Sequence, residues 1–142
     1  MIALDTNVIV RLVTADDAGQ IKAARAVFEA GDLWVAKTVC LETEWILRYS
    51  YELRPPAIRE VFRKLLGYPR LQVEDRSAVL RALTLYDQGL DFADALHLAS
   101  SGDADRFATF DQPLAKRIRG LEEGPMVVLL QSAAAGRSRA SR

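Results

Sequence analysis

The chain opens with Met1-Ile2-Ala3-Leu4-Asp5-Thr6-Asn7-Val8, an apolar run that stops at a cluster of polar residues. Such a run is too short for a helix and is typical of a buried strand. The pattern recurs along the chain, where short apolar runs bounded by polar or turn residues predict further buried strands. These runs are Leu33–Ala36, Leu71–Val73, Phe107–Phe110 and Met126–Leu130.

Segments with a helical spacing of apolar residues separate the predicted strands. They are Val8–Thr14, Gly19–Ala30, Val39–Tyr51, Pro56–Leu66, Ser77–Gln88, Phe92–Ser101 and Pro113–Arg119. Strands that alternate with helices indicate parallel crossovers, which place helices on both faces of a sheet. The predicted fold is therefore a three-layer α/β/α domain with a central, mostly parallel sheet of about five strands.

Length and composition limit the possible classes of protein. The 142 residues, half of them hydrophobic, suit one globular domain, expected over residues 1–131 and followed by a flexible basic tail over residues 132–142. No apolar stretch is long enough for a membrane helix, and the N-terminus does not resemble a secretory signal. We therefore expect a cytoplasmic protein without membrane association.

Charge and cysteine content exclude several kinds of site. Cys40 is the only cysteine, so neither an internal disulfide nor a thiolate cluster for zinc or iron–sulfur is possible. With 19 basic and 19 acidic residues, the chain is not a bulk nucleic-acid coat, and any nucleic-acid binding needs a local basic surface. Arg11, Lys37, Arg48 and Lys116 are candidate phosphate contacts, although a solvated face explains them equally well.

Two acids follow predicted strands directly: Asp5 after the first and Asp111 after the fourth. In an open parallel sheet, ligands bind beyond the carboxyl ends of the strands, which suggests a functional role for both acids. An alternative for Asp5 is the capping of the helix that begins near Asn7. Asn7 favours the functional interpretation, because it adds a second short polar residue where an apolar one would serve the fold.

Further acids lie within apolar helical stretches. Glu42 is three positions after Val39 and four and seven positions before Ile46 and Tyr49. It is therefore predicted to lie with them on a largely buried stripe of the helix. Glu44 is predicted to be a surface residue that pairs with Arg48 one turn later. Asp91 is a potential helix cap that places Asp94 in the first turn, where Asp94 either complements the helix dipole or has a functional role.

If Asp5, Glu42, Asp94 and Asp111 meet at one end of the sheet, their negative charges lie close together and repel one another. A divalent cation resolves that repulsion. Ligation by oxygen atoms alone favours Mg²⁺, with Mn²⁺ as a substitute, over zinc. Such a cation could position a water for attack on a phosphodiester.

Three segments give the sequence a family resemblance: Ala3-Leu4-Asp5-Thr6-Asn7-Val8, Val39-Cys40-Leu41-Glu42-Thr43-Glu44-Trp45-Ile46-Leu47-Arg48 and Asp91-Phe92-Ala93-Asp94-Ala95-Leu96-His97-Leu98-Ala99. Together with Phe107-Ala108-Thr109-Phe110-Asp111, they resemble the PIN-domain family, specifically the VapC-type toxins of type II toxin–antitoxin systems. The resemblance covers roughly residues 1–130.

This resemblance implies an acidic quartet of Asp5, Glu42, Asp94 and Asp111 that binds metal and catalyses the reaction. It also implies supporting roles for Thr6 and Asn7, and a possible extra ligand in Asp91. The activity it implies is Mg²⁺-dependent endoribonucleolytic cleavage of RNA, with a cognate antitoxin that blocks the site and commonly a homodimer.

Other conspicuous residues have structural explanations. His97 lies one turn past Asp94 and is expected to hydrogen-bond within its helix rather than to catalyse. Trp34, Trp45 and Phe62 are possible base-stacking platforms, but their apolar neighbours favour core packing. Cys40 is expected to be a small core residue.

Three alternative functions remain open from the sequence. A non-toxin PIN nuclease in RNA processing would carry the same acids, whereas a PIN-like protein-binding module would not need them. A haloacid-dehalogenase-type phosphatase also starts with a strand that ends in aspartate, but it needs a second aspartate two positions later. Asn7 occupies that position here.

Overall fold

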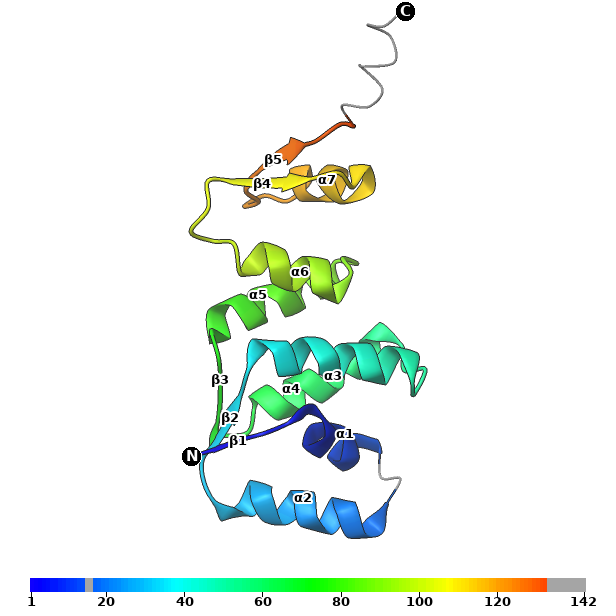
Figure 1. Ribbon diagram of the computed structural model, residues 1–142, viewed down its shortest axis with the longest axis vertical. Helices are drawn as coiled ribbons and strands as arrows, with labels where there is room; N and C mark the ends of the chain where they lie inside the picture. Colours follow the sequence, from blue (N-terminus) through cyan, green and yellow to red (C-terminus); the bar gives the residue numbers. More distant parts are fainter. Residues whose placement is uncertain (15–16, 133–142) are drawn as a thin grey trace, which may run out of the picture. The chain divides into compact units, whose positions relative to one another are not determined.

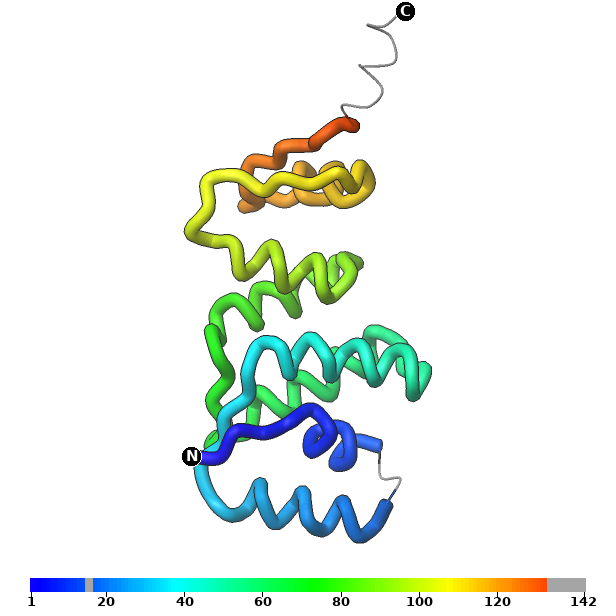
Figure 2. Tube along the Cα trace, viewed as in Figure 1, coloured from blue at the N-terminus to red at the C-terminus, as the bar shows by residue number. Residues whose placement is uncertain are grey.

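A computed structural model describes residues 1–14 and 17–132 of the chain. The chain divides into two compact units, Met1–Ser100 and Ser101–Arg142. Figure 1 shows the elements of each unit and Figure 2 the course of the backbone. The predicted basic tail lies outside the described residues from residue 133 onward.

The first unit contains a three-stranded parallel sheet of β1 (Ile2–Ala3), β2 (Leu33–Val35) and β3 (Leu71–Val73), in the order β1-β2-β3. Leu33 of β2 pairs with Ile2 on one side and with Leu71 on the other. Helices separate these strands in sequence, as parallel pairing requires. The alternation places the strand ends, and the acids that follow them, along one edge of the sheet.

Six helices complete this unit (Figure 1), and their ends follow local sequence signals. They are α1 (Thr6–Thr14), α2 (Ala18–Ala30), α3 (Lys37–Tyr49), α4 (Pro55–Leu66), α5 (Arg76–Asp87) and α6 (Phe92–Ala99). Asp17 caps α2 by accepting a hydrogen bond from the Gln20 amide at 2.9 Å. Pro55 and Pro56 start α4, where a missing amide hydrogen costs nothing and the fixed φ suits a helix.

The second unit contains β4 (Arg106–Thr109), α7 (Gln112–Arg119) and β5 (Met126–Leu129). The two strands pair in parallel, with Arg106 opposite Met126, and α7 is the crossover between them. All five strands and seven helices therefore form close to their predicted positions in the described residues. The predicted α/β/α class is confirmed.

One detail of the strand prediction is loose and another is wrong. In the described part of the chain, the strands form a three-stranded sheet in the first unit and a two-stranded pair in the second, so a count of about five for the central sheet is loose. Not all of them are buried: β2 and β3 carry buried residues at both ends, but Ile2 and Ala3 of β1 are exposed, β4 alternates between exposed and half-buried residues, and β5 has one exposed residue followed by three half-buried ones. Within its sheet, β1 is a two-residue strand at one end and pairs only with β2.

The core of the first unit lies under α4, α5 and α6. The rings of Phe62 and Phe92 stack with their centroids 5.4 Å apart, and Tyr86 meets Phe92 edge-on at the same distance. Both phenylalanines are fully buried. This aromatic cluster joins α4, α5 and α6 and so fixes the start of α6, where two of the candidate acids lie.

Within the described residues, no helix combines the length and apolar character needed to span a membrane.

Candidate functional site

Asp5 lies at the point where β1 gives way to α1. Leu4 extends the strand pairing by donating its amide hydrogen to Trp34 O at 2.9 Å, and Thr6 begins the helix. The Oδ1 atom of Asp5 accepts a hydrogen bond from the adjacent Thr6 amide at 2.8 Å, whereas a capping residue ordinarily bonds two or three positions ahead. The side chain is exposed, and no ion pair engages it in the described structure. Its carboxylate is therefore accessible to a ligand.

Thr6 carries an unusual hydroxyl next to this carboxylate. The residue is buried, and its Oγ1 atom has no hydrogen-bond partner among the described residues. An unpaired buried hydroxyl costs about 1–3 kcal/mol, so its retention points to a functional reason. Asn7 follows on the exposed side of α1.

Asp91 and Asp94 lie together at the start of α6. Asp91 caps the helix, as predicted, by accepting a hydrogen bond from the Asp94 amide at 3.3 Å. Asp94 is half-buried in the first turn. The cap holds the Asp91 carboxylate at the backbone amide of Asp94.

Arg48 of α3 lies next to Asp91. Its Nη2 atom lies 3.6 Å from Asp91 Oδ1, and its guanidinium lies 4.5 Å from the centre of the Tyr49 ring. Glu44 holds the same guanidinium through Oε2 at 2.9 Å from Nε and Oε1 at 3.2 Å from Nη2. This bidentate pair raises the pKa of Arg48, so the arginine is a fixed positive charge beside Asp91.

The predicted burial of Glu42 and Glu44 is wrong. Glu44, expected at the surface, is 1% exposed, while Glu42, expected on a buried stripe, is exposed. The buried residues of α3 are Cys40, Thr43, Glu44 and Leu47. These residues are spaced by three and four positions and so form one face of the helix, whereas Glu42, at about 100° per residue, lies about 200° from Cys40 and from Glu44 and points away from that face.

Tyr86 supplies the third contact to the buried Glu44 carboxylate. Its hydroxyl donates to Oε2 at 3.0 Å, and burial together with the Glu44 charge raises its pKa. The Glu44–Arg48–Tyr86 network, formed by these three side chains, joins α3 to α5 and reaches Asp91 on α6. Sequence reasoning predicted the Glu44–Arg48 pair, which is confirmed, but missed its burial and the contact with Tyr86; the spacing of Glu44 from Cys40 and Leu47 was an available signal for the burial.

Asp111 belongs to the second unit. It caps α7 by accepting a hydrogen bond from the Leu114 amide at 2.9 Å, and its own amide donates to Thr109 Oγ1 at 3.0 Å. It is exposed and follows β4 after one intervening residue, Phe110. Its placement at the carboxyl end of a parallel strand matches that of Asp5.

The remaining candidates divide between core and surface. Phe62 and Cys40 are buried as predicted, and burial raises the pKa of the Cys40 thiol to about 12. The prediction of core packing is wrong for Trp45, which is 53% exposed because it shares the solvent face of α3 with Tyr49. Trp34 is half-buried, and His97 is exposed near the end of α6.

Three of the four candidate phosphate contacts already have partners, Arg48 among them through Glu44 and Asp91. Lys37 pairs with Asp75 at 3.0 Å, and Arg11 bonds to Gln20 and to the Tyr51 hydroxyl at 3.2 Å. Lys116 lies on the exposed side of α7.

The donor chemistry of the acids suits a hard cation. Across residues 1–14 and 17–132, no group of three or more His, Cys, Asp or Glu side chains that could hold a metal ion is found. Mg²⁺ keeps several waters and usually takes only one or two carboxylates from a protein. The accessible Asp5 carboxylate beside the unpaired Thr6 hydroxyl, and the Asp91–Asp94 pair, provide oxygen donors of that kind.

The chain was compared with curated proteins and with protein families. No curated protein matches it. The family model described as the PIN domain matches residues 2–120, which include β1, the Glu44–Arg48–Tyr86 network, the start of α6 and Asp111. The chain therefore belongs to the PIN domain family.

Proposed function

We propose that this protein is a Mg²⁺-dependent endoribonuclease and the toxin component of a toxin–antitoxin pair. PIN domains are generally metal-dependent nucleases that act on RNA. The observation that carries the proposal is the accessible carboxylate of Asp5 at the end of β1, beside a buried hydroxyl without a partner, within the matched residues.

The proposed catalytic and metal-binding residues are Asp5, Glu42, Asp94 and Asp111, with supporting roles for Thr6, Asn7 and Asp91. A bound Mg²⁺, or Mn²⁺ in its place, would stabilise the charge that develops on the scissile phosphate and favour deprotonation of the attacking water. The protein's own contribution is to hold the carboxylates. Asp91 fixes the first turn of α6 by capping it, and Arg48 holds Asp91 from the side.

The nuclease proposal is tested by incubating the purified protein with RNA and Mg²⁺ or Mn²⁺, and then with EDTA. We expect Asp5→Asn and Asp94→Asn to slow cleavage about 100-fold or more, because metal-assisted charge stabilisation is worth several kcal/mol. Asparagine keeps the size and capping ability of aspartate, so the fold is retained. Asp103→Asn, an exposed acid outside the proposed site, is the matched control and should cut like the wild type.

Two outcomes would reject this function. One is RNA cleavage that survives EDTA. The other is equal cutting by the wild type, Asp5→Asn and Asp94→Asn, which would leave a protein-binding PIN module as the better description.

The toxin role is supported by an apolar groove in the first unit. It has a volume of about 510 Å³ and lies between α1, which contributes Leu12 and Val13, and α4, which contributes Ala57 and Val61. An amphipathic helix of an antitoxin fits a surface of this kind.

The antitoxin proposal has a direct test. Co-expression with the product of an adjacent small reading frame should give a stable complex that no longer cuts RNA in the cytoplasm, where we propose that both act. Ala57→Glu should abolish the complex while RNA cleavage by the free protein persists.

Sedimentation of the purified protein tests the proposed homodimer. A cutting enzyme without any such partner would be a PIN nuclease of RNA processing instead.

A further inference from the structure

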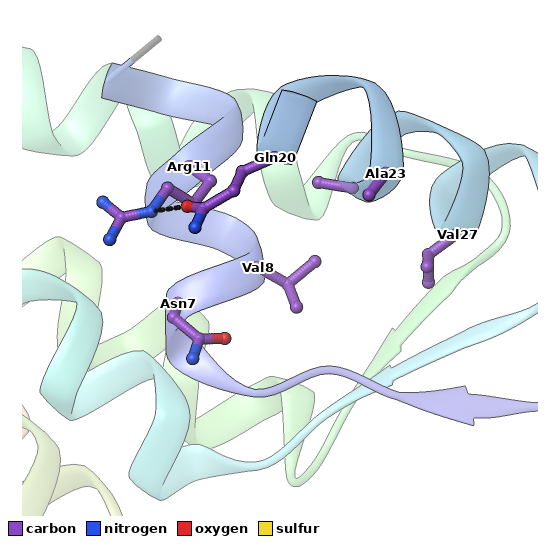
Figure 3. Close-up of a pocket in the computed structure, with 7 residues that line it drawn as sticks. Asn7, Val8, Arg11, Gln20, Ala23 and Val27 are labelled. Carbon is purple, nitrogen blue, oxygen red and sulfur yellow. Dashed lines mark hydrogen bonds between the residues drawn. The ribbon is translucent and has the colours of Figure 1, made fainter. Parts of the chain in front are cut away.

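A second groove lies on the opposite face of α1, between α1 and α2, and has a volume of about 310 Å³ (Figure 3). This α1–α2 groove is lined by Asn7, Val8, Arg11, Gln20, Ala23, Ala24 and Val27. Its size is at the lower end of the range of about 300–1,000 Å³ that small-molecule sites occupy. The groove therefore suits a group of the size of a single nucleotide.

The groove begins next to the proposed site of cleavage. Asn7 lines one end of it and follows Asp5 by two residues in the first turn of α1. In Figure 3, Val8 lies between Asn7 and the Arg11–Gln20 pair, with Ala23 and Val27 of α2 opposite. A chain that places a phosphate at Asp5 can therefore continue along α1 into this groove.

The lining has the chemistry of a nucleotide site. Alanines on α2 leave the space open, and Val8 and Val27 provide apolar walls for a base or ribose. The carboxamides of Asn7 and Gln20 offer donors and acceptors for the edge of a base. Among the residues that the structure describes, none that lines the groove is acidic, so these side chains do not repel a polyanion.

Arg11 lies at one end of the groove, where two hydrogen bonds hold its guanidinium without using all of its N–H donors. Its Nε bonds to the Gln20 side chain and its Nη1 to the Tyr51 hydroxyl at 3.2 Å. These bonds use two of the five guanidinium N–H groups, and neither partner neutralises the charge. A phosphate contact by such a preorganised arginine loses little side-chain entropy.

We propose that the α1–α2 groove binds the nucleotide next to the scissile bond of a single-stranded RNA, with Arg11 on its phosphate. This inference rests on the proposed nuclease function and specifies how that function selects its substrate. A peptide segment is the competing occupant. The absence of acids from the lining and the position beside Asp5 favour RNA.

The test measures RNA binding separately from cleavage. Fluorescence anisotropy with a labelled single-stranded RNA oligonucleotide is recorded in Mg²⁺, with Asp5→Asn as the background so that the RNA stays intact. Ala23→Phe fills the groove and displaces the nucleotide, and we expect it to raise the Kd about tenfold, which corresponds to about 1.4 kcal/mol. Ala26→Phe, at an exposed alanine of the same helix that does not line the groove, should leave the Kd unchanged.

Arg11→Gln provides a second variant that adds no bulk. It should weaken binding and lower the slope of log Kd against log salt by about 0.7, the value for one phosphate contact on a single strand. Unchanged RNA binding by both Ala23→Phe and Arg11→Gln would overturn the proposal, as would equal losses in Ala23→Phe and Ala26→Phe. Loss of antitoxin binding with unchanged RNA binding would assign the groove to a peptide.

Failure of the nuclease proposal is a different result. It would appear as absence of metal-dependent cutting by the wild-type protein, whatever the groove variants do in the binding assay. If the wild type cuts RNA, Ala23→Phe should also change which nucleotide precedes or follows the cut, and Ala26→Phe should not.

Discussion

Replacement of Tyr86 by phenylalanine is a sharp test of the buried network in the first unit. Tyr86→Phe removes the hydroxyl that donates to Glu44 Oε2 at 3.0 Å and keeps the ring that packs against Phe92. Glu44 is 1% exposed and Tyr86 7% exposed, so water does not readily replace the lost donor. The carboxylate keeps its two bonds to Arg48, which limits the damage.

The expected loss follows from the charge on the acceptor. Hydrogen bonds to charged groups contribute about 1.5–3 kcal/mol, against about 0.5–1.5 kcal/mol for neutral pairs. We therefore expect Tyr86→Phe to lower the free energy of unfolding by about 2 kcal/mol and the Tm by about 4–8 °C. Tyr68→Phe is the matched control, because its half-buried hydroxyl donates at 2.9 Å to a neutral acceptor, the carbonyl of Phe28. Its cost should be about 1 kcal/mol or less.

Urea unfolding followed by tryptophan fluorescence measures both variants, and a double-mutant cycle with Glu44→Gln isolates the interaction between the two side chains. Glutamine keeps the shape of the side chain but not its charge, so we expect a coupling free energy of about 1 kcal/mol. If Tyr86→Phe costs no more than Tyr68→Phe, or if its effect adds to that of Glu44→Gln without coupling, the hydroxyl does not serve a buried carboxylate and the reasoning fails.

Two further predictions concern pH and backbone packing. Burial raises the pKa of the Cys40 thiol from 9.0 to about 12, so the unfolded chain loses this proton first as the pH rises. Stability contributed by the protonated thiol should therefore fall above pH 9, by up to about 1.4 kcal/mol per pH unit, and urea unfolding of Cys40→Ala should lack this part of the slope. In the second unit, a Cβ at Gly124 would lie 2.8 Å from the carbonyl oxygen of Ile118, whereas one at Gly102 would meet nothing within 4 Å. Gly124→Ala should lower the free energy of unfolding by about 1–3 kcal/mol and Gly102→Ala should not, as thermal unfolding would show.

The order and class of the elements were predictable from the sequence because both depend on local pattern. Short apolar runs and helical spacings are properties of neighbouring residues, and so are caps such as Asp91 and helix starts such as Pro55. Sheet membership depends on pairing between distant segments. The division of the strands into β1-β2-β3 and β4-β5 was for that reason beyond the reach of local pattern.

The same distinction explains the error on α3. A helix is amphipathic as a whole, but which acid on it is buried depends on what packs against it. Tyr86, the partner that makes burial of Glu44 tolerable, is 42 residues away, and no local spacing announces it. The exposed Trp45 was misplaced with it, because the buried face of the helix was assigned to the wrong side.

The error also changes the reason for proposing Glu42 as a functional acid. Burial was the wrong criterion, since a carboxylate taken out of water requires permanent partners, and Glu44 has three of them in Arg48 Nε, Arg48 Nη2 and the Tyr86 hydroxyl. A carboxylate so engaged has little capacity left for a cation. Glu42 is exposed and carries no ion pair in the described part of the chain, which is the condition that metal binding requires. The two acids of α3 thus suit separate tasks: Glu44 fixes Arg48 next to Asp91 at the start of α6, and Glu42 keeps the accessibility that its proposed role needs.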